Sequence, residues 1–243
     1  MARTKKVYKR VLLKLSGEAL AGERGYGLDV GVIQKTAQEI KEVTRLGTQL
    51  GVVVGGGNIF RGLAASARGM DRIQADYLGM LATLFNAVAI RETLLRVKVP
   101  AVVFSALPLP ALAETYYPQA ARREVEAGKV LLLAAGTGNP YFTTDTAAAL
   151  RASELGADLI LKATQVDGVY DDDPRLNPQA RLYTEMEYDQ YLQGRLEVMD
   201  ATAISLAREN NIPIVVFNGM IKGHLKKIVT GSSIGTLIRG VRP

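Results

Sequence analysis

Short apolar runs, many of them β-branched, alternate with segments of helical periodicity along almost the whole chain. The runs predict buried strands at residues 7–15, 49–55, 101–105, 129–134, 159–163 and 214–217, with a short last strand at 235–238. Helical spacing predicts helices over residues 32–45, 76–97, 143–155 and 200–210. Such alternation favours an α/β fold, a sandwich around a largely parallel sheet.

The composition excludes several kinds of site. The 243 residues are 48% hydrophobic, enough to form one large domain or two small ones. Without cysteine there are no disulfides, thiolate ligands or cysteine nucleophiles, and the single His224 cannot build a multi-histidine zinc site. We find no repeat and no flexible linker, so one continuous sheet with two lobes is expected rather than two separable domains.

The net charge of +6 comes from the N-terminal arm. Residues 1–14 carry six of the 30 basic residues and no acid, which leaves 24 basic and 24 acidic side chains in the rest of the chain. A nucleic-acid-binding face is therefore not expected. Lys14 interrupts the apolar run of the arm, which argues against a signal peptide, and stretches without charge reach only 15 residues, short of the roughly 20 that a membrane span needs. We expect a soluble, cytoplasmic protein.

Three glycine-rich segments each follow a predicted strand. They lie at residues 14–18 (continuing to 22–27), at 55–58 and at 136–140. Parallel strands end at one edge of the sheet, and glycine lets backbone N–H groups approach a phosphate there. One such segment alone is more often a tight turn. Three together, with Lys14 and Arg61 beside them, favour a site for several phosphate groups.

The familiar phosphate motifs are absent from this sequence. No Gly-x4-Gly-Lys-Ser/Thr segment occurs, so the chain is not a P-loop protein. Tyr141 stands where a dinucleotide fingerprint starting at Gly136 would have its third glycine. The protein-kinase segments His-Arg-Asp and Asp-Phe-Gly are also missing. Any phosphate transfer therefore needs another architecture.

Four segments resemble bacterial uridylate kinases, which belong to the amino acid kinase superfamily. They are Lys-Leu-Ser-Gly at 14–17, Gly-Gly-Gly-Asn at 55–58 with Arg61, Thr-Gly-Asn-Pro-Tyr-Phe-Thr-Thr-Asp at 137–145, and the segment 161–170. The similarity extends from about residue 7 to residue 239. The first two motifs are shared across the superfamily, whereas the third is specific to uridylate kinases.

This resemblance implies an activity and an architecture. It implies transfer of the ATP γ-phosphate to UMP in de novo pyrimidine nucleotide biosynthesis, with Mg²⁺ carried by ATP and no metal site on the protein. It also implies a three-layer α/β/α fold, a homohexamer, activation by GTP and inhibition by UTP. The acceptor-binding lobe would span about residues 1–160 and the ATP-binding lobe about 161–243. Residues 91–103, which meet effectors or neighbouring subunits in the family, match less closely.

The resemblance also implies roles for individual residues. Catalysis would involve Lys14, Arg61 and Asp145. ATP would contact Lys14, Leu15, Ser16, Gly17, Gly57, Arg61, Lys162, Thr164, Tyr170 and Asp173. UMP would contact Gly56, Asp76, Thr137, Gly138, Asn139, Pro140, Tyr141, Phe142, Thr143 and Thr144. Asp200 is a further acid expected near the site.

Structural alternatives compete with four of these roles. Lys14 could be a lysine whose ammonium snorkels from an edge strand, and Arg61 could form a surface ion pair; we favour phosphate binding for both. Asp145 and Asp76 could each act only as helix caps. Arg72 and Arg68 are expected to be solvated.

Three other functions remain open. The first is a sister kinase acting on a carboxylate or carbamate, which leaves the 136–145 segment unexplained. The second is a non-catalytic nucleotide-binding protein, which is disfavoured by the presence together of Lys14, Arg61 and Asp145. The third is a nucleic-acid-binding regulator that uses the basic arm, and the neutral charge balance of the rest makes this at most an added role.

Overall fold

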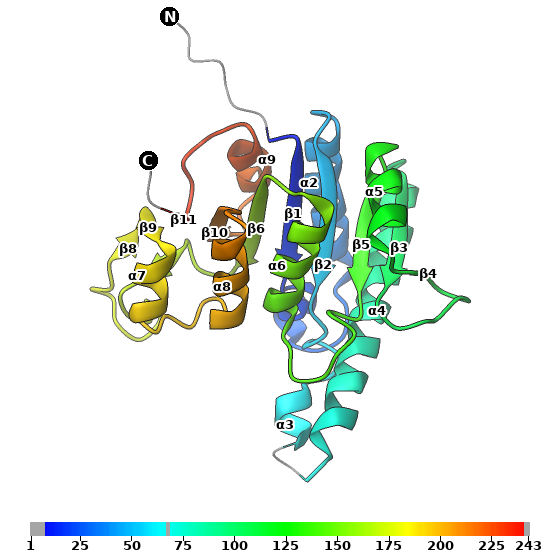
Figure 1. Ribbon diagram of the computed structural model, residues 1–243, viewed down its shortest axis with the longest axis horizontal. Helices are drawn as coiled ribbons and strands as arrows, with labels where there is room; N and C mark the ends of the chain where they lie inside the picture. Colours follow the sequence, from blue (N-terminus) through cyan, green and yellow to red (C-terminus); the bar gives the residue numbers. More distant parts are fainter. Residues whose placement is uncertain (1–7, 67–68, 241–243) are drawn as a thin grey trace, which may run out of the picture.

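The computed structural model describes residues 8–66 and 69–240, and its centre is a nine-stranded sheet (Figure 1). The strand order is β4-β3-β5-β2-β1-β6-β10-β11-β9. All neighbouring strands pair in parallel except β10 and β11, which are antiparallel. The bounds are β1 (Arg10–Leu15), β2 (Gln49–Val54), β3 (Ala101–Ser105), β4 (Glu114–Thr115), β5 (Val130–Ala134), β6 (Leu159–Thr164), β9 (Glu185–Glu187), β10 (Ile214–Asn218) and β11 (Thr236–Arg239). A separate two-stranded sheet pairs β7 (Val169–Tyr170) with β8 (Leu182–Tyr183).

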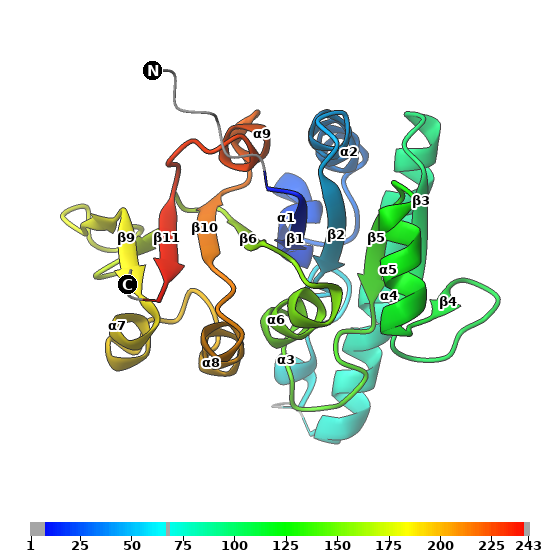
Figure 2. The same ribbon diagram turned by 45° about the horizontal axis from the view of Figure 1, so that its top comes forward.

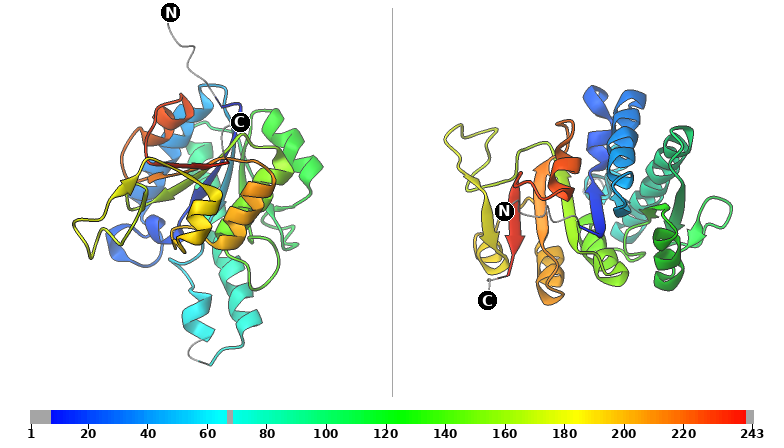
Figure 3. Two further views of the ribbon diagram at one scale, coloured as in Figure 1. Left: turned by 60° about the vertical axis from the view of Figure 1, so that its left-hand side comes forward. Right: turned by 90° about the horizontal axis from the view of Figure 1, so that it is seen from above.

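Helices cover both faces of the large sheet. One face carries α1 (Gly17–Leu20), α2 (Val30–Thr44), α4 (Arg72–Arg96) and α9 (His224–Val229), and the other carries α5 (Pro118–Glu126), α6 (Thr144–Leu155), α7 (Tyr188–Gln193) and α8 (Ala201–Glu209). Figures 2 and 3 show the two helical layers on either side of the strands. A short helix, α3 (Gly62–Ser66), packs on α4, and a 3-10 turn covers Gly22–Arg24. The predicted three-layer α/β/α sandwich is confirmed.

The central strands are buried on both faces, which explains their continuous apolar sequences. In β5, Leu131 and Leu133 pack in the core beneath α6, while Val130 and Leu132 pack in the core beneath α4. This alternation follows from the period of two in strand side chains. The apolar runs therefore located these strands to within three residues at each end, and β3 without any difference.

The helix boundaries correct one interpretation of the sequence. Helix α4 begins at Arg72 rather than at Asp76, because Asp71 is its N-cap and accepts a hydrogen bond from the backbone N–H of Gln74 at 3.0 Å. The short or polar elements α1, α3, α5, α7, β4 and β7–β9 were not predicted. They expose much of their surface or span too few residues to display a period.

Helix α4 also bears on the membrane prediction. By length and composition its 25 residues could cross a bilayer. The sequence had argued against any membrane span, because its stretches without charge are short. In this fold 44% of its most apolar window is buried inside the protein, where residues such as Leu84, Ile90 and Leu94 join the core beneath the sheet. Core helices of soluble proteins pass the same test.

Candidate active site

The site begins at the junction of β1 and β6, where two lysines are partners in register. Lys14 of β1 pairs with Lys162 of β6 across the parallel ladder. Both side chains share the strand face of Leu12 and Ile160, which pack in the core with α6. Two cations thus point to the same side of the sheet, close to its carboxyl edge.

Helix α6 brings a carboxylate between these cations. Its buried side contains Ala147, Ala148, Ala149 and Ala152, whose small side chains let the helix approach the sheet closely. Thr143 is its N-cap, accepting from the N–H groups of Asp145 at 3.0 Å and Thr146 at 3.3 Å. Asp145 is therefore not a cap, and its carboxylate instead contacts both lysines.

The three charges form one buried cluster. Lys14 Nζ lies 2.9 Å from Asp145 Oδ1, and Lys162 Nζ donates a hydrogen bond to Oδ2. Burial alone would raise the pKa of Asp145, but the two ammonium groups outweigh it and hold that pKa below the ordinary value. Burial lowers the pKa of Lys162 to about 8, although Asp145 acts against this shift. Two cations and one anion leave the cluster attractive to an added anion.

The first two glycine segments fit tightly against each other and against α4. A Cβ on Gly17 would lie 2.6 Å from the carbonyl oxygen of Gly55, and one on Gly56 would lie 2.7 Å from that of Gly79. The side chains of Asn58 and Asn86 exchange two buried hydrogen bonds of 2.7 and 3.1 Å, and Asn86 also donates to Gly55 O at 2.7 Å. Here glycine is needed for close approach of backbone to backbone.

The third glycine segment closes a cavity of about 510 Å³, in the range typical of small-molecule sites. The cavity lies between this segment, the Gly55–Gly57 turn and the start of α4. Its walls are formed by Glu18, Gly56, Gly57, Phe60, Arg61, Gly62, Arg72, Ala75, Asp76, Gly79, Met80, Thr83, Gly136, Thr137, Asn139, Phe142, Thr143 and Thr144. Gly138, Pro140 and Tyr141 are not among them, nor are the three charged residues of the buried cluster, one of which follows Thr144 directly in α6.

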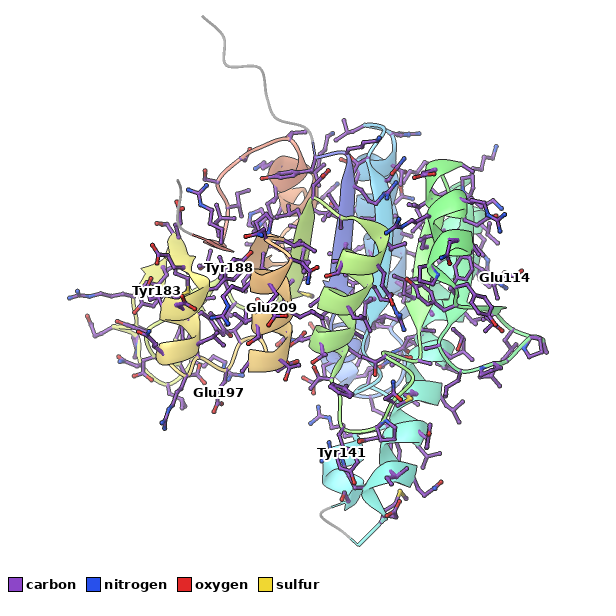
Figure 4. The ribbon with its side chains drawn as sticks, viewed as in Figure 1. Glu114, Tyr141, Tyr183, Tyr188, Glu197 and Glu209 are labelled. Atoms are coloured by element: carbon purple, nitrogen blue, oxygen red, sulfur yellow. The ribbon has the colours of Figure 1, made fainter. Side chains whose placement is uncertain are left out.

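Asp76 and Arg72 join the loop to helix α4. Arg72 Nε donates to both carboxylate oxygens of Asp76 at 2.9 and 3.0 Å, and the backbone N–H of Tyr141 donates to Asp76 at 2.8 Å. The Arg72 guanidinium also lies over the Tyr141 ring, 5.3 Å from its centre. Figure 4 shows Tyr141 beside the α3–α4 end of the molecule. Arg72, which was expected to be solvated, keeps 34% of its side chain exposed but is paired with Asp76. Arg68 lies outside the described residues.

Arg61 lines the cavity and forms the surface ion pair that was the alternative to its predicted phosphate-binding role. Its guanidinium lies 2.8 Å from Glu18, with both side chains more than half exposed. Its Nε also donates to Gly57 O at 3.3 Å. An exposed pair of this kind contributes little stability, so the guanidinium is free to exchange Glu18 for another anion.

The residues predicted to contact ATP after Lys162 lie at the end of β6 and in the segment that follows it. Thr164 Oγ1 donates to the carbonyls of Val166 at 2.7 Å and Phe217 at 3.2 Å, which fixes the start of the first loop. Tyr170 belongs to β7, and Asp173 pairs with Arg175 at 2.8 Å in an exposed turn. The structure does not bring Tyr170 or Asp173 into the cavity described above.

Several polar residues of the site were missed in the sequence. Thr83 Oγ1 accepts from the N–H of Ala135 at 2.7 Å, and Asn86 holds Asn58; both interrupt the apolar pattern of α4, a signal that could have been noticed. Asp200, which was expected near the site, caps α8 and also accepts from Thr143 and Thr146. It thereby joins the starts of α6 and α8.

The acids near the cluster suit a metal that arrives with its ligand. Among the described residues no group of three or more His, Cys, Asp or Glu side chains could hold a metal ion. Mg²⁺ usually binds one or two carboxylates together with substrate phosphates and water. Asp145 and Asp200 are the acids available for that role, which fits a cation held mainly by phosphate oxygens.

Comparisons with known proteins agree with this geometry. The model of the Amino acid kinase family matches residues 9–218. The structure is similar to the UMP kinase from Bacillus anthracis, with 38% identity, coverage of 98% of each chain and a TM-score of 0.94. It is also similar to the UMP kinase from Ureaplasma parvum (36% identity, 95% of this chain, 98% of that chain, TM-score 0.89) and the uridylate kinase from Archaeoglobus fulgidus (30%, 94%, 99%, 0.71). With the glycine-rich edge, the buried lysine–aspartate cluster and these matches together, the chain belongs to the amino acid kinase family.

Proposed function

We propose that this protein transfers the γ-phosphate of ATP to UMP, giving ADP and UDP, in pyrimidine nucleotide biosynthesis. The observation that carries the proposal is the cavity beneath the Gly136–Thr144 segment, which ends one residue before the buried Asp145. A substrate in the cavity can therefore present its phosphate to the two lysines. The similarity to UMP kinases over nearly the whole chain supports UMP as that substrate.

The chemistry requires charge stabilisation rather than proton removal. An oxygen of the UMP phosphate attacks Pγ of ATP, a new P–O bond forms, and the bond between Pγ and the β,γ-bridging oxygen breaks with its electrons leaving on ADP. The second pKa of a phosphate ester is about 6, so the attacking oxygen is already ionised at neutral pH. No general base is needed, and Asp145 serves to orient Lys14 and Lys162.

The two lysines then have a shared task. In the loose transition state, negative charge lies on the equatorial oxygens of the transferred group and on the leaving oxygen. Lys14 and Lys162, held in place by one carboxylate, present ammonium groups to that charge. Mg²⁺ bound with ATP would neutralise part of the triphosphate charge, with Asp145 and Asp200 as its carboxylate partners.

The proposed lobes correspond to two parts of one sheet. All residues that line the cavity fall within positions 18–144, which supports an acceptor-binding lobe at about 1–160. The ATP-binding lobe would be 161–243, with Lys162, Thr164, Tyr170 and Asp173 as contacts to the phosphate donor, while Gly17 and Gly57 would contact ATP from the other lobe. Arg61 would exchange its pair with Glu18 for a phosphate oxygen.

We also propose that the chain assembles as a homohexamer, with GTP and UTP as effectors. Helix α4 supports assembly, because Leu78, Leu81 and Phe85 expose 39%, 44% and 56% of their surface along one side of it. Their spacing of three and four residues makes a continuous apolar stripe. Such stripes on soluble proteins commonly mark an interface.

The test is ADP release with Mg²⁺ and ATP across UMP, CMP, dUMP, AMP and GMP, with aspartate, glutamate and carbamate as further acceptors. Turnover confined to UMP is expected. Turnover with only a carboxylate or carbamate would retain the family and refute the acceptor. Binding of ATP without any turnover would instead favour a non-catalytic nucleotide-binding protein.

A further inference from the structure

A buried arginine outside the cavity contacts the base of the acceptor loop. Arg151 lies two turns into α6, and only 6% of its side chain is exposed. Its Nη2 donates to the carbonyl oxygen of Gly136 at 3.1 Å. Gly136 lines the cavity, whereas Arg151 does not. The guanidinium therefore reaches the substrate site only through the loop backbone.

The base of this loop is a place where the backbone needs support. Ala135 and Gly136 have φ angles of 59° and 58°, so two successive residues adopt the left-handed conformation. For a residue with a Cβ, such as Ala135, this conformation costs free energy that surrounding contacts must offset. On the α4 side, Thr83 Oγ1 accepts from the Ala135 N–H; on the α6 side, Arg151 donates to Gly136.

Two further side chains hold the guanidinium in place. Arg151 Nη1 lies 2.7 Å from Glu154 Oε2, which also accepts from the hydroxyl of Tyr116 at 2.8 Å. The guanidinium stacks over the Tyr116 ring, 3.9 Å from its centre. Burial and Glu154 both raise the pKa of Tyr116, so its hydroxyl keeps the proton that it donates. Glu154 and the Tyr116 ring thus fix the orientation of the guanidinium that donates to Gly136.

We propose that Arg151 is a positioning residue that sets the height of the Gly136–Thr144 loop above the acceptor cavity, with Glu154 and Tyr116 fixing its guanidinium. This inference rests on the proposed function, because it assigns the loop to the acceptor. Losing the Gly136 contact would let the left-handed turn relax and move Thr137 and Asn139 away from the acceptor. The donor side, built on β1 and β6, would keep its geometry.

The test compares UMP and ATP in Arg151→Met and Arg151→Lys. We expect Arg151→Met to weaken calorimetric UMP binding and raise the KM for UMP by about tenfold, the size typical of a lost hydrogen bond to a charged group. The KM for ATP should change less than twofold. Arg151→Lys keeps the charge but loses the planar fork whose Nη1 and Nη2 serve Glu154 and Gly136 separately, so its UMP affinity should lie between those of the wild type and Arg151→Met.

Arg10 provides a matched control. It is another mostly buried arginine, with 13% of its side chain exposed, and it is paired with Glu126 at 2.8 Å and hydrogen-bonded to the carbonyl of Leu155. It contacts the opposite end of α6, far from the loop. Arg10→Met should lower Tm by about as much as Arg151→Met does, but it should not weaken UMP binding more than ATP binding.

Each result decides between these possibilities. Equal losses of UMP and ATP affinity in both Arg151 variants, or no loss at all, would refute the positioning role. If Arg151→Met does not fold, Arg151→Lys decides, with at least a threefold selective loss of UMP affinity expected. Wild-type protein that turns over no UMP would refute the proposed function instead. The role of Arg151 is judged separately, from the UMP and ATP affinities of each variant relative to those of the wild type.

Discussion

At the residue scale, the proposed phosphate transfer depends on the position of the Lys14 ammonium group. It is a buried ammonium 2.9 Å from Asp145, at the end of a strand and outside the walls of the acceptor cavity. Lys14→Ala should therefore lower kcat by at least about a hundredfold, as removal of one charge-stabilising donor does, and leave the KM for UMP within about threefold. Steady-state kinetics measure both quantities. Lys9→Ala, an exposed lysine on the same segment, is the control; an unchanged kcat for Lys14→Ala would remove it from the chemistry.

The pKa of Lys162, about 8 against an ordinary 10.5, gives the protein opposite responses of activity and stability to pH. Above about pH 8 the native protein loses this proton and one cation of the cluster, so kcat/KM for ATP should fall as pH rises. Between about 8 and 10.5 the unfolded chain binds more protons than the native protein, so this residue's contribution to the free energy of unfolding should increase with pH. Rate profiles and denaturant titrations at matched pH test both. In Lys162→Arg, any remaining activity should show no alkaline fall near pH 8.

Asp76 is the acidic side chain of the cavity wall that the loop itself contacts. Asp76→Asn removes the charge that pairs with Arg72 and weakens the hydrogen bond that the backbone N–H of Tyr141 donates to residue 76. We expect roughly tenfold weaker UMP binding with ATP binding unchanged, since a hydrogen bond to a charged group contributes about 1.5–3 kcal/mol. Isothermal titration with each nucleotide measures the two affinities. A loss confined to ATP would place Asp76 on the donor side.

At the element scale, the turn after β2 is shaped by how closely it approaches α4. A Cβ on Gly56 would lie 2.7 Å from the helix backbone at Gly79 O, whereas one on Gly57 would make an ordinary 3.5 Å contact with Glu18 Cγ. Gly56→Ala should lower the free energy of unfolding by about 1–3 kcal/mol, and Gly57→Ala by less than about 1 kcal/mol. At this chain length each kcal/mol shifts Tm by about 2–4 °C, which calorimetry resolves. Equal shifts would contradict the close fit.

The elements also show what a sequence can and cannot reveal about this protein. The strands were predictable because burial on both faces leaves continuous apolar runs. Lys14 lies within the first of these runs, and the glycine turns follow the runs directly, whereas Asp145 was expected from the resemblance of the 137–145 segment. Contacts across the sequence were not predictable: Asn58 with Asn86, and Arg151 with Gly136, link residues whose polarity has no local explanation. The caps at Asp71 and Thr143 were not recognised, because two nearby acids, Asp76 and Asp145, also suited a helix start.

At the scale of the whole molecule, the exposed stripe of α4 is the surface most suited to another copy of the chain. Phe85→Asp places a carboxylate in that stripe, where its desolvation in an interface would cost several kcal/mol. We expect the wild type to sediment as an assembly and the variant to sediment as smaller species with an unchanged circular dichroism spectrum. Leu176→Asp, at an 83% exposed leucine elsewhere on the surface, is the control. Assembly that is unaffected by Phe85→Asp would exclude this stripe.

The pairing of Lys14 with Lys162 in neighbouring strands limits where the chain can accept insertions or deletions. A single inserted or deleted residue before Lys14 within β1 would turn the ammonium to the opposite face of the sheet, toward α2 and away from Asp145. Strand register thus determines whether the two lysines face Asp145. Insertions or deletions within β1 and β6 would disrupt both the packing of the core and the position of these lysines. Turns at the other edge of the sheet, such as the one through Gly47, carry neither constraint. Length variation should therefore be tolerated at that edge and absent from the two lysine strands.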